Sequence, residues 1–317
     1  MVKGESSGSS NGSRARIKRL TKKERKQKGK LEVRSRSKLS GSFSLAWKSA
    51  KTIRTYWKPL FGIMLVYLIL NVVFASGVSN LSSVVSDIKF NLEASDSENL
   101  NPLGTALGGF SNLVASAGTS GSATGSTLQT TLIIIVSLVI IWSLRSLLAG
   151  KTIKVKQAYY SSMFPLIPFL LVLLVLFIQW LPVLLGVPIA SAILSAIFVS
   201  GGVFATTLLV MISIALLGWS LYMISSSLFA IYIVTLPDMQ PRKALRSAKD
   251  LVAFRRWTIM RRLIVLPIVM LVAMAVVVIP LILYLTFLVT PVFLVLSVLS
   301  VLFIHTYLYL LYRELIT

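Results

Sequence analysis

From residue 59 onward, long apolar segments alternate with polar or basic ones. Each apolar segment has close to or more than the roughly 20 residues with which a helix crosses the ~30 Å hydrocarbon core of a bilayer. The pattern predicts an all-α, polytopic membrane protein with six transmembrane helices, at about residues 59–78, 128–149, 163–185, 203–235, 263–281 and 291–312.

The middle of the chain, residues 157–237, contains no Asp, Glu, Lys or Arg. Basic residues at both of its ends require an even number of crossings, and two fit its length better than four. Pro182 and Pro188 predict a break, after which residues 189–200 are interpreted as a re-entrant or interfacial half-helix ending at Gly201-Gly202. Irregular backbone at this depth must be buried or line water, so the glycines mark a cavity or a packing break.

Two further features refine the predicted spans. Residues 263–312 lack charge and would reach about 75 Å as one helix, so Pro280 and Pro291 are expected to mark a turn. Arg145, near the end of the second span, is expected to extend its side chain to the headgroups.

A basic segment precedes the fifth span and has the pattern of an amphipathic helix. On a helical wheel, Ala244, Leu245, Ala248, Leu251 and Val252 fall on one side, and Arg242, Lys243, Arg246, Lys249 and Arg256 fall on the other. This predicts a helix lying on the membrane surface. Arg255 falls on the apolar side, so it must extend to the interface or reach a phosphate. An ordinary cytoplasmic loop that follows the positive-inside rule is the alternative.

A second copy of this segment precedes the first span. Residues 46–58 align without gaps on residues 244–256 with four identities, and residues 158–162 are a fainter third copy before the third span. We therefore predict a repeated unit, in which a surface helix is followed by a transmembrane hairpin. The candidate residues for lipid headgroups are Arg242, Lys243, Arg246, Lys249, Arg255, Arg256, Lys48 and Lys51.

Composition and charge placement agree with a membrane protein: 56% of residues are hydrophobic, 13% are charged, and mean hydropathy is +0.83. The net charge of +22 would suit a nucleic-acid binder, but 18 of the 32 Lys and Arg precede Pro59. Residues 1–41 are predicted to be a disordered basic cytoplasmic tail that binds anionic lipid or ribosomal RNA, or only sets topology. Residues 42–317 form the transmembrane domain, with residues 79–127 as an extracytoplasmic loop. In this region, residues 78–95 are expected to form a short helix or a strand, and residues 118–126 a flexible linker.

The charge placement also predicts orientation. With both termini in the cytoplasm of a cell membrane, every basic residue except Lys89 faces the cytoplasm.

The residues available for chemistry are few. The chain has no Cys and one His, and it lacks nucleotide-binding and hydrolase motifs, so we expect no enzyme activity, no cofactor and no metal site. His305, in the sixth span, is either a hydrogen-bonded packing residue or a proton relay. Two functions remain open: a non-enzymatic component that interacts with anionic lipid or with a membrane-protein partner and organises the envelope, or a small transporter or permease-like subunit with a pathway near Gly201-Gly202 and His305.

One resemblance bears on these alternatives. The pattern of Pro241, Ala244-Leu245, Ser247, Leu251 and Trp257 before a span, together with the related residues 46–53, resembles the membrane domain found with glycerophosphoryl diester phosphodiesterases and related bacterial integral membrane proteins. It covers roughly residues 42–317, and Phe254 stands where a Gly is usual. The resemblance implies about six helices in a membrane. The phosphodiesterase activity of such proteins belongs to a separate soluble domain, for which this chain has no room.

Overall fold

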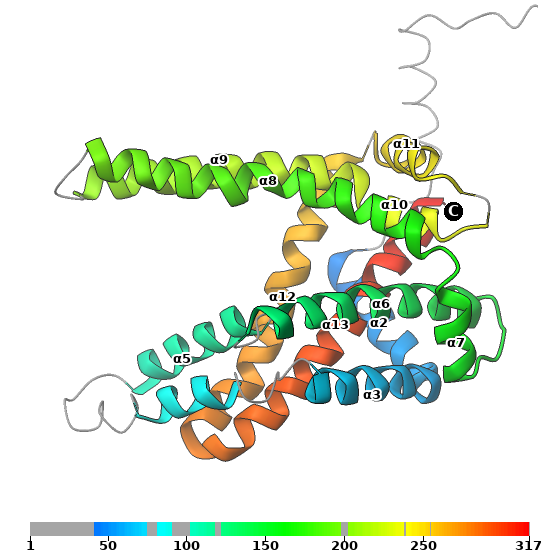
Figure 1. Ribbon diagram of the computed structural model, residues 1–317, viewed down its shortest axis with the longest axis horizontal. Helices are drawn as coiled ribbons and strands as arrows, with labels where there is room; N and C mark the ends of the chain where they lie inside the picture. The colour runs from blue at the N-terminus through cyan, green and yellow to red at the C-terminus, as the bar shows by residue number, and fades with distance from the viewer. Residues whose placement is uncertain are drawn as a thin grey trace, which may run out of the picture. The chain divides into compact units, whose positions relative to one another are not determined.

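The computed structural model describes residues 41–74, 81–90, 102–117, 122–197, 202–237, 239–253 and 255–316, and within these ranges it contains helices and no strand (Figure 1). The predicted tail lies outside the described residues, except for Gly41. Among the described residues, six helical segments are long and apolar enough to cross a membrane: α3 (Trp57–Phe74), α6 (Ala123–Leu148), α8 (Leu166–Ile197), α9 (Val203–Ser227) continued by α10 (Ala230–Val234), α12 (Arg256–Tyr284) and α13 (Thr286–Ile316). The predicted all-α class with six spans is confirmed.

A short helix stands before every second span. These are α2 (Ser42–Thr55) before α3, α7 (Val155–Ser162) before α8, and α11 (Pro241–Val252) before α12. They pack mainly on α13, α6 and α10, respectively. The order of one short helix and two spans thus occurs three times. We call the end of the bundle formed by these three helices and the last turns of α13 the basic end.

The hairpin of α8 and α9 corrects the expected half-helix. α8 continues through Pro182 and Pro188 to Ile197, so residues 189–197 belong to the span itself. Membrane helices tolerate proline because neighbouring groups satisfy the backbone that it leaves without a partner. The two helices lie side by side (Figure 1), and at Gly186 a Cβ atom would be only 2.7 Å from Cδ1 of Leu216. The lack of a side chain here lets the helices approach closely.

The turn between α12 and α13 lies at Leu285, while Pro280 and Pro291 are inside the helices. Near this turn the expected extracytoplasmic loop contains helix: residues 81–90, for which a helix and a strand were both open, are helical, and α5 (Pro102–Ser116), which was not expected, packs on α12. Their apolar side chains join α12 and α13 in one cluster, which includes Leu81, Val85, Ile88, Phe110, Leu113, Val278, Ile282 and Phe293. Apolar residues three or four positions apart drive this packing, although Ser and Gly dominate the composition around them.

Candidate functional site at the basic end

The exposed face of α11 carries a cluster of four basic residues. Its small apolar residues Ala244, Ala248 and Val252 are fully buried against the bundle. The basic residues on the other face are exposed, and they are Arg242, Lys243, Arg246 and Lys249. The helix is divided as the wheel predicts. Its apolar side fastens it to the bundle, and its cations face outward.

Arg255 and Arg256 differ from these four, because α11 ends at Val252 and both residues belong to the start of α12. Arg256 is half-buried: its Nη1 donates a hydrogen bond to the Tyr222 hydroxyl at 2.8 Å, and its guanidinium carbon lies 5.1 Å from the centre of that ring. Arg255 is also half-buried. The expectation that Arg256 continues the polar face of one helix is wrong. It fastens α12 to α9 instead.

The short helices α7 and α11 bury residues at equivalent positions of the predicted repeat. On α7 the buried residues Ala158 and Ser162 occupy the aligned positions of Ala244 and Ala248. Contacts with α3 hold α7 in place, because the Tyr159 hydroxyl donates a hydrogen bond to the Ile63 carbonyl at 3.2 Å. Burial raises the pKa of Tyr159 to about 12.

On α2 the buried face is shifted by one residue. Leu45 and Ser49 are buried, whereas Ala50, the counterpart of buried Ala248, is exposed, as are Trp47 and Lys51. One residue corresponds to a rotation of about 100° around a helix axis. The buried faces of α2 and α11 are therefore not equivalent, although the two segments align without gaps.

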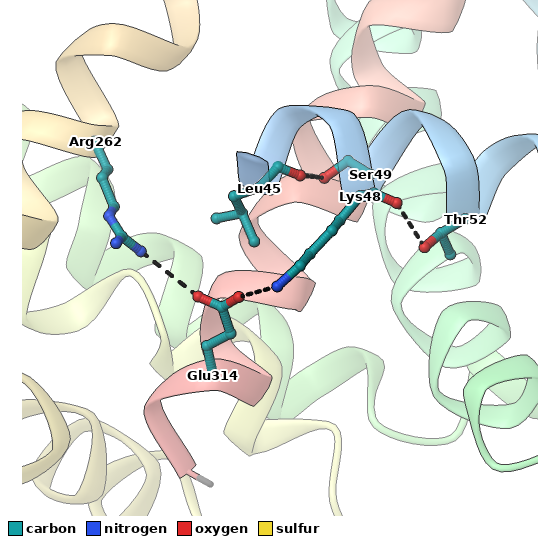
Figure 2. A network of polar contacts seen from close by, with 6 residues as sticks. All are labelled: Leu45, Lys48, Ser49, Thr52, Arg262 and Glu314. Atoms are coloured by element: carbon teal, nitrogen blue, oxygen red, sulfur yellow. Dashed lines mark hydrogen bonds and ion pairs between the residues drawn. The ribbon is translucent and has the colours of Figure 1, made fainter. Parts of the chain in front are cut away.

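Glu314, in the last turn of α13, is the centre of a polar contact that sequence reasoning missed. Its Oε1 lies 3.1 Å from Lys48 Nζ on α2, and its Oε2 lies 3.8 Å from Arg262 Nη1 on α12 (Figure 2). Arg262 is almost completely buried, with 4% of its side chain exposed, and Glu314 is 21% exposed. Lys48, a predicted headgroup ligand, thus pairs with a carboxylate. The signal in the sequence is that Glu314 is the only acid after Asp250.

A groove of about 990 Å³ lies beside Arg145, between the end of α6, the start of α8 and the segment that joins α10 to α11. The guanidinium of Arg145, which was expected to reach the headgroups, donates hydrogen bonds to protein acceptors. Its Nη1 donates to the Thr235 carbonyl at 2.6 Å, and its Nη2 donates to the Tyr232 carbonyl at 2.8 Å and to the Thr235 hydroxyl at 2.5 Å. Because these acceptors lie at the C-terminal end of α10, where helix carbonyls lack partners, Arg145 caps that helix.

The lining of this groove is mixed in character. Polar and cationic side chains come from the end of α6, the following segment and α7, and they are Arg145, Ser146, Lys151, Thr152, Gln157 and Ser161. Thr235 and Gln240 add polar lining from the segment between α10 and α11. Apolar side chains form much of the remaining wall, including Trp142, Ile153, Phe164, Pro168, Val234 and Met239. No described acidic residue lines the groove.

His305 and Gly202, the candidates for a pathway, are in separate places. His305 Nε2 lies 2.9 Å from the Ser137 hydroxyl, and Nδ1 lies 3.5 Å from the Tyr232 hydroxyl, so the ring joins α13, α6 and α10. Gly202 precedes the first residue of α9, and Gly201 lies outside the described residues. Neither His305 nor Gly202 lines the groove at Arg145. Within the described ranges, no group of three His, Cys, Asp or Glu residues is placed to hold a metal ion.

Fold and site define a class of protein, a multi-pass α-helical integral membrane protein with a cationic end. Comparison with known proteins adds no relative, since no family model, no curated protein and no solved structure matches the chain.

Proposed function

We propose that this chain is a non-enzymatic component of the cell membrane whose basic end faces the cytoplasm and binds anionic lipid headgroups, and that it acts in membrane organisation. One observation carries the proposal: the four basic residues of α11 are exposed and make no hydrogen bond or ion pair with another described residue. Because α11 packs on the bundle through its apolar side, these four charges can bind an external anion.

The magnitude of the interaction favours a lipid surface. A basic residue close to an anionic leaflet contributes about 1 kcal/mol, so the four residues together supply several kcal/mol. This is small beside the insertion of six apolar spans, and it is enough to enrich acidic lipid around the protein. The single His and the absence of Cys support the non-enzymatic part, because they leave no thiol nucleophile and few nitrogen or sulfur ligands for a metal ion.

The orientation follows from the same charges. Translocating the basic end would carry nearly all the Lys and Arg across the membrane, against the positive-inside rule. Single cysteines at the exposed Ser83 and Ser247 test it, since the chain has no native Cys. An impermeant thiol reagent should label position 83 in intact cells and position 247 only after lysis. The reverse labelling would place the basic end outside.

Lipid content of the purified protein tests the binding. We expect Arg242→Gln, Lys243→Gln, Arg246→Gln and Lys249→Gln together to leave the protein folded and to reduce co-purifying acidic phospholipid, measured by mass spectrometry. The matched control replaces Lys22, Lys23, Arg25 and Lys26 of the N-terminal segment with Gln, which removes the same charge elsewhere. Equal losses in both variants would mean that net charge, and not the surface of α11, attracts the lipid.

A further inference from the structure

The groove beside Arg145 has the size of a ligand site. Its volume of about 990 Å³ is at the upper end of the roughly 300–1,000 Å³ that is usual for small-molecule pockets. It lies where the spans α6 and α8 meet the short helix α7 and the segment before α11. A ligand in this position would lie at the boundary between headgroups and acyl chains.

The polar part of the groove favours an anion. Arg145 is held by two carbonyls and one hydroxyl, which are neutral acceptors, so these bonds fix the guanidinium in place without neutralising its charge. Lys151 adds a second charge from the exposed segment after Gly150, whose φ of +77° turns the chain out of α6. Two cations thus line the groove, and no acid among the described lining residues offsets them.

The apolar part of the groove favours a ligand that also has hydrocarbon. Trp142, Phe164 and Pro168 line the groove. Phe164 is at the same time 91% exposed. Ile167, one turn further along the chain, is 72% exposed on α8. The apolar lining thus continues onto the exposed surface of a membrane span, where acyl chains lie.

We propose that the groove binds one anionic phospholipid, with the phosphate toward Arg145 and Lys151 and the acyl chains along Phe164 and the exposed side of α8. The phosphate supplies the acceptor for the two cations, and the glycerol and upper acyl segments fill the apolar wall. The inference rests on the proposed function only in the class of ligand. It concerns a different surface, because the four basic residues of α11 do not line the groove.

A photoreactive phenylalanine identifies the ligand directly. Benzoylphenylalanine replaces Phe164 in the groove or, as a control, Phe177, which is 56% exposed on α8 outside it. The protein is placed in nanodiscs of phosphatidylethanolamine with a minor fraction of phosphatidylglycerol, and lipid adducts are measured by mass spectrometry. We expect phosphatidylglycerol to be enriched at position 164 and to follow the bulk composition at position 177. The same composition at both positions would overturn the proposal.

Matched substitutions test the headgroup contact without touching Arg145, which caps α10. Lys151→Gln removes the cation of the groove, and Lys154→Gln removes a neighbouring exposed cation that does not line it. Losing one cationic contact should lower the enrichment at position 164 about fivefold, and Lys154→Gln should leave it unchanged. Ser161→Trp, on the groove wall, should reduce both lipids by filling the space. Equal adducts in the Lys151 and Lys154 variants would contradict the assigned headgroup position.

Two further outcomes separate this site from other sources of binding. An excess of inorganic phosphate should leave the adduct in place, because acyl contacts hold the lipid; its loss would make the groove a phosphate site and overturn the proposal. The α11 variant should retain the enrichment at position 164 even if its bulk lipid content falls. The α11 variant could leave the bulk lipid content unchanged while the Lys151 variant removes the enrichment at position 164. That result would show that the groove binds lipid and that the basic face of α11 does not.

Discussion

Replacing Glu314 with Gln tests how the last turn of α13 is held to two other helices. The carboxylate lies 3.8 Å from the Nη1 atom of Arg262 and 3.1 Å from Nζ of Lys48 (Figure 2). At an effective dielectric constant of about 20, the attraction to Arg262 is about 4 kcal/mol before desolvation is counted. Removing one partner of a buried pair usually costs about 3–5 kcal/mol.

Two features reduce that cost here. The side chain of Glu314 is 21% exposed, and 3.8 Å is too long for a direct hydrogen bond. The Lys48 side chain is 54% exposed, so the ion pair between Lys48 and Glu314 contributes about 1 kcal/mol or less to stability. We therefore expect Glu314→Gln to lower the free energy of unfolding by about 2–3 kcal/mol and Lys48→Gln by less than about 1 kcal/mol.

The assay is equilibrium unfolding in mixed micelles of rising sodium dodecyl sulfate content, followed by far-UV circular dichroism. A double-mutant cycle with Arg262→Met isolates the buried pair. Once Met replaces Arg262, Glu314→Gln should cost only the share of Lys48, below about 1 kcal/mol. The reasoning fails if Glu314→Gln costs the same in both backgrounds.

Three other predictions concern the packing of Gly62, the buried faces of α11 and α2, and the hydrogen bond of Tyr159. Gly62→Ala should destabilise the protein by about 1–3 kcal/mol, because the new Cβ would lie 2.7 Å from Cγ2 of Val155; adding Val155→Ala should restore stability, and no recovery would contradict the clash. Ala248→Leu should cost a similar amount, and Ala50→Leu should change stability by less than about 0.5 kcal/mol, since only Ala248 is buried; equal effects would argue against the shifted face of α2. Tyr159→Phe should cost about 0.5–1.5 kcal/mol near neutral pH by removing the bond to Ile63. Because burial raises the pKa of Tyr159 from 10.0 to about 12, the folded state holds this proton more tightly, so stability falls as pH rises from 10 to 12; the Phe variant should lose less over that interval.

The spans could be predicted because the bilayer imposes a single requirement on them. A segment without charge and of sufficient length must form a helix in lipid, whatever its neighbours are. The break predicted at the prolines of α8 is absent because the bilayer also favours a continuous helix there. Pro182 and Pro188 predict a break in water, whereas packing within the hairpin lets the helix continue.

The contacts between helices were less accessible from the sequence. In α2 the wheel places Ala50 on the same side as its counterpart in α11, but a side chain next to a membrane can face either lipid or protein. Helix 81–90 could be narrowed only to a short helix or a strand, and α5 was not predicted, because Ser, Gly and Asn surround its apolar residues. The charged face of α11 was predicted because both of its faces are encoded locally. The bonds of Arg145 were not, because Tyr232 and Thr235 follow almost ninety residues later.

The length of the α8–α9 hairpin has a consequence for how the protein sits among lipids. α8 has 32 residues and is about 48 Å long, well above the ~30 Å of a typical hydrocarbon core. Tilting or local thickening of the bilayer must absorb the difference. In this hairpin α8 and α9 pack mainly on each other, and otherwise on α10, α11 and α12. We therefore expect its tilt to change with membrane thickness, and the hydrogen bonds of Arg145 to the end of α10 link the hairpin to the end of α6.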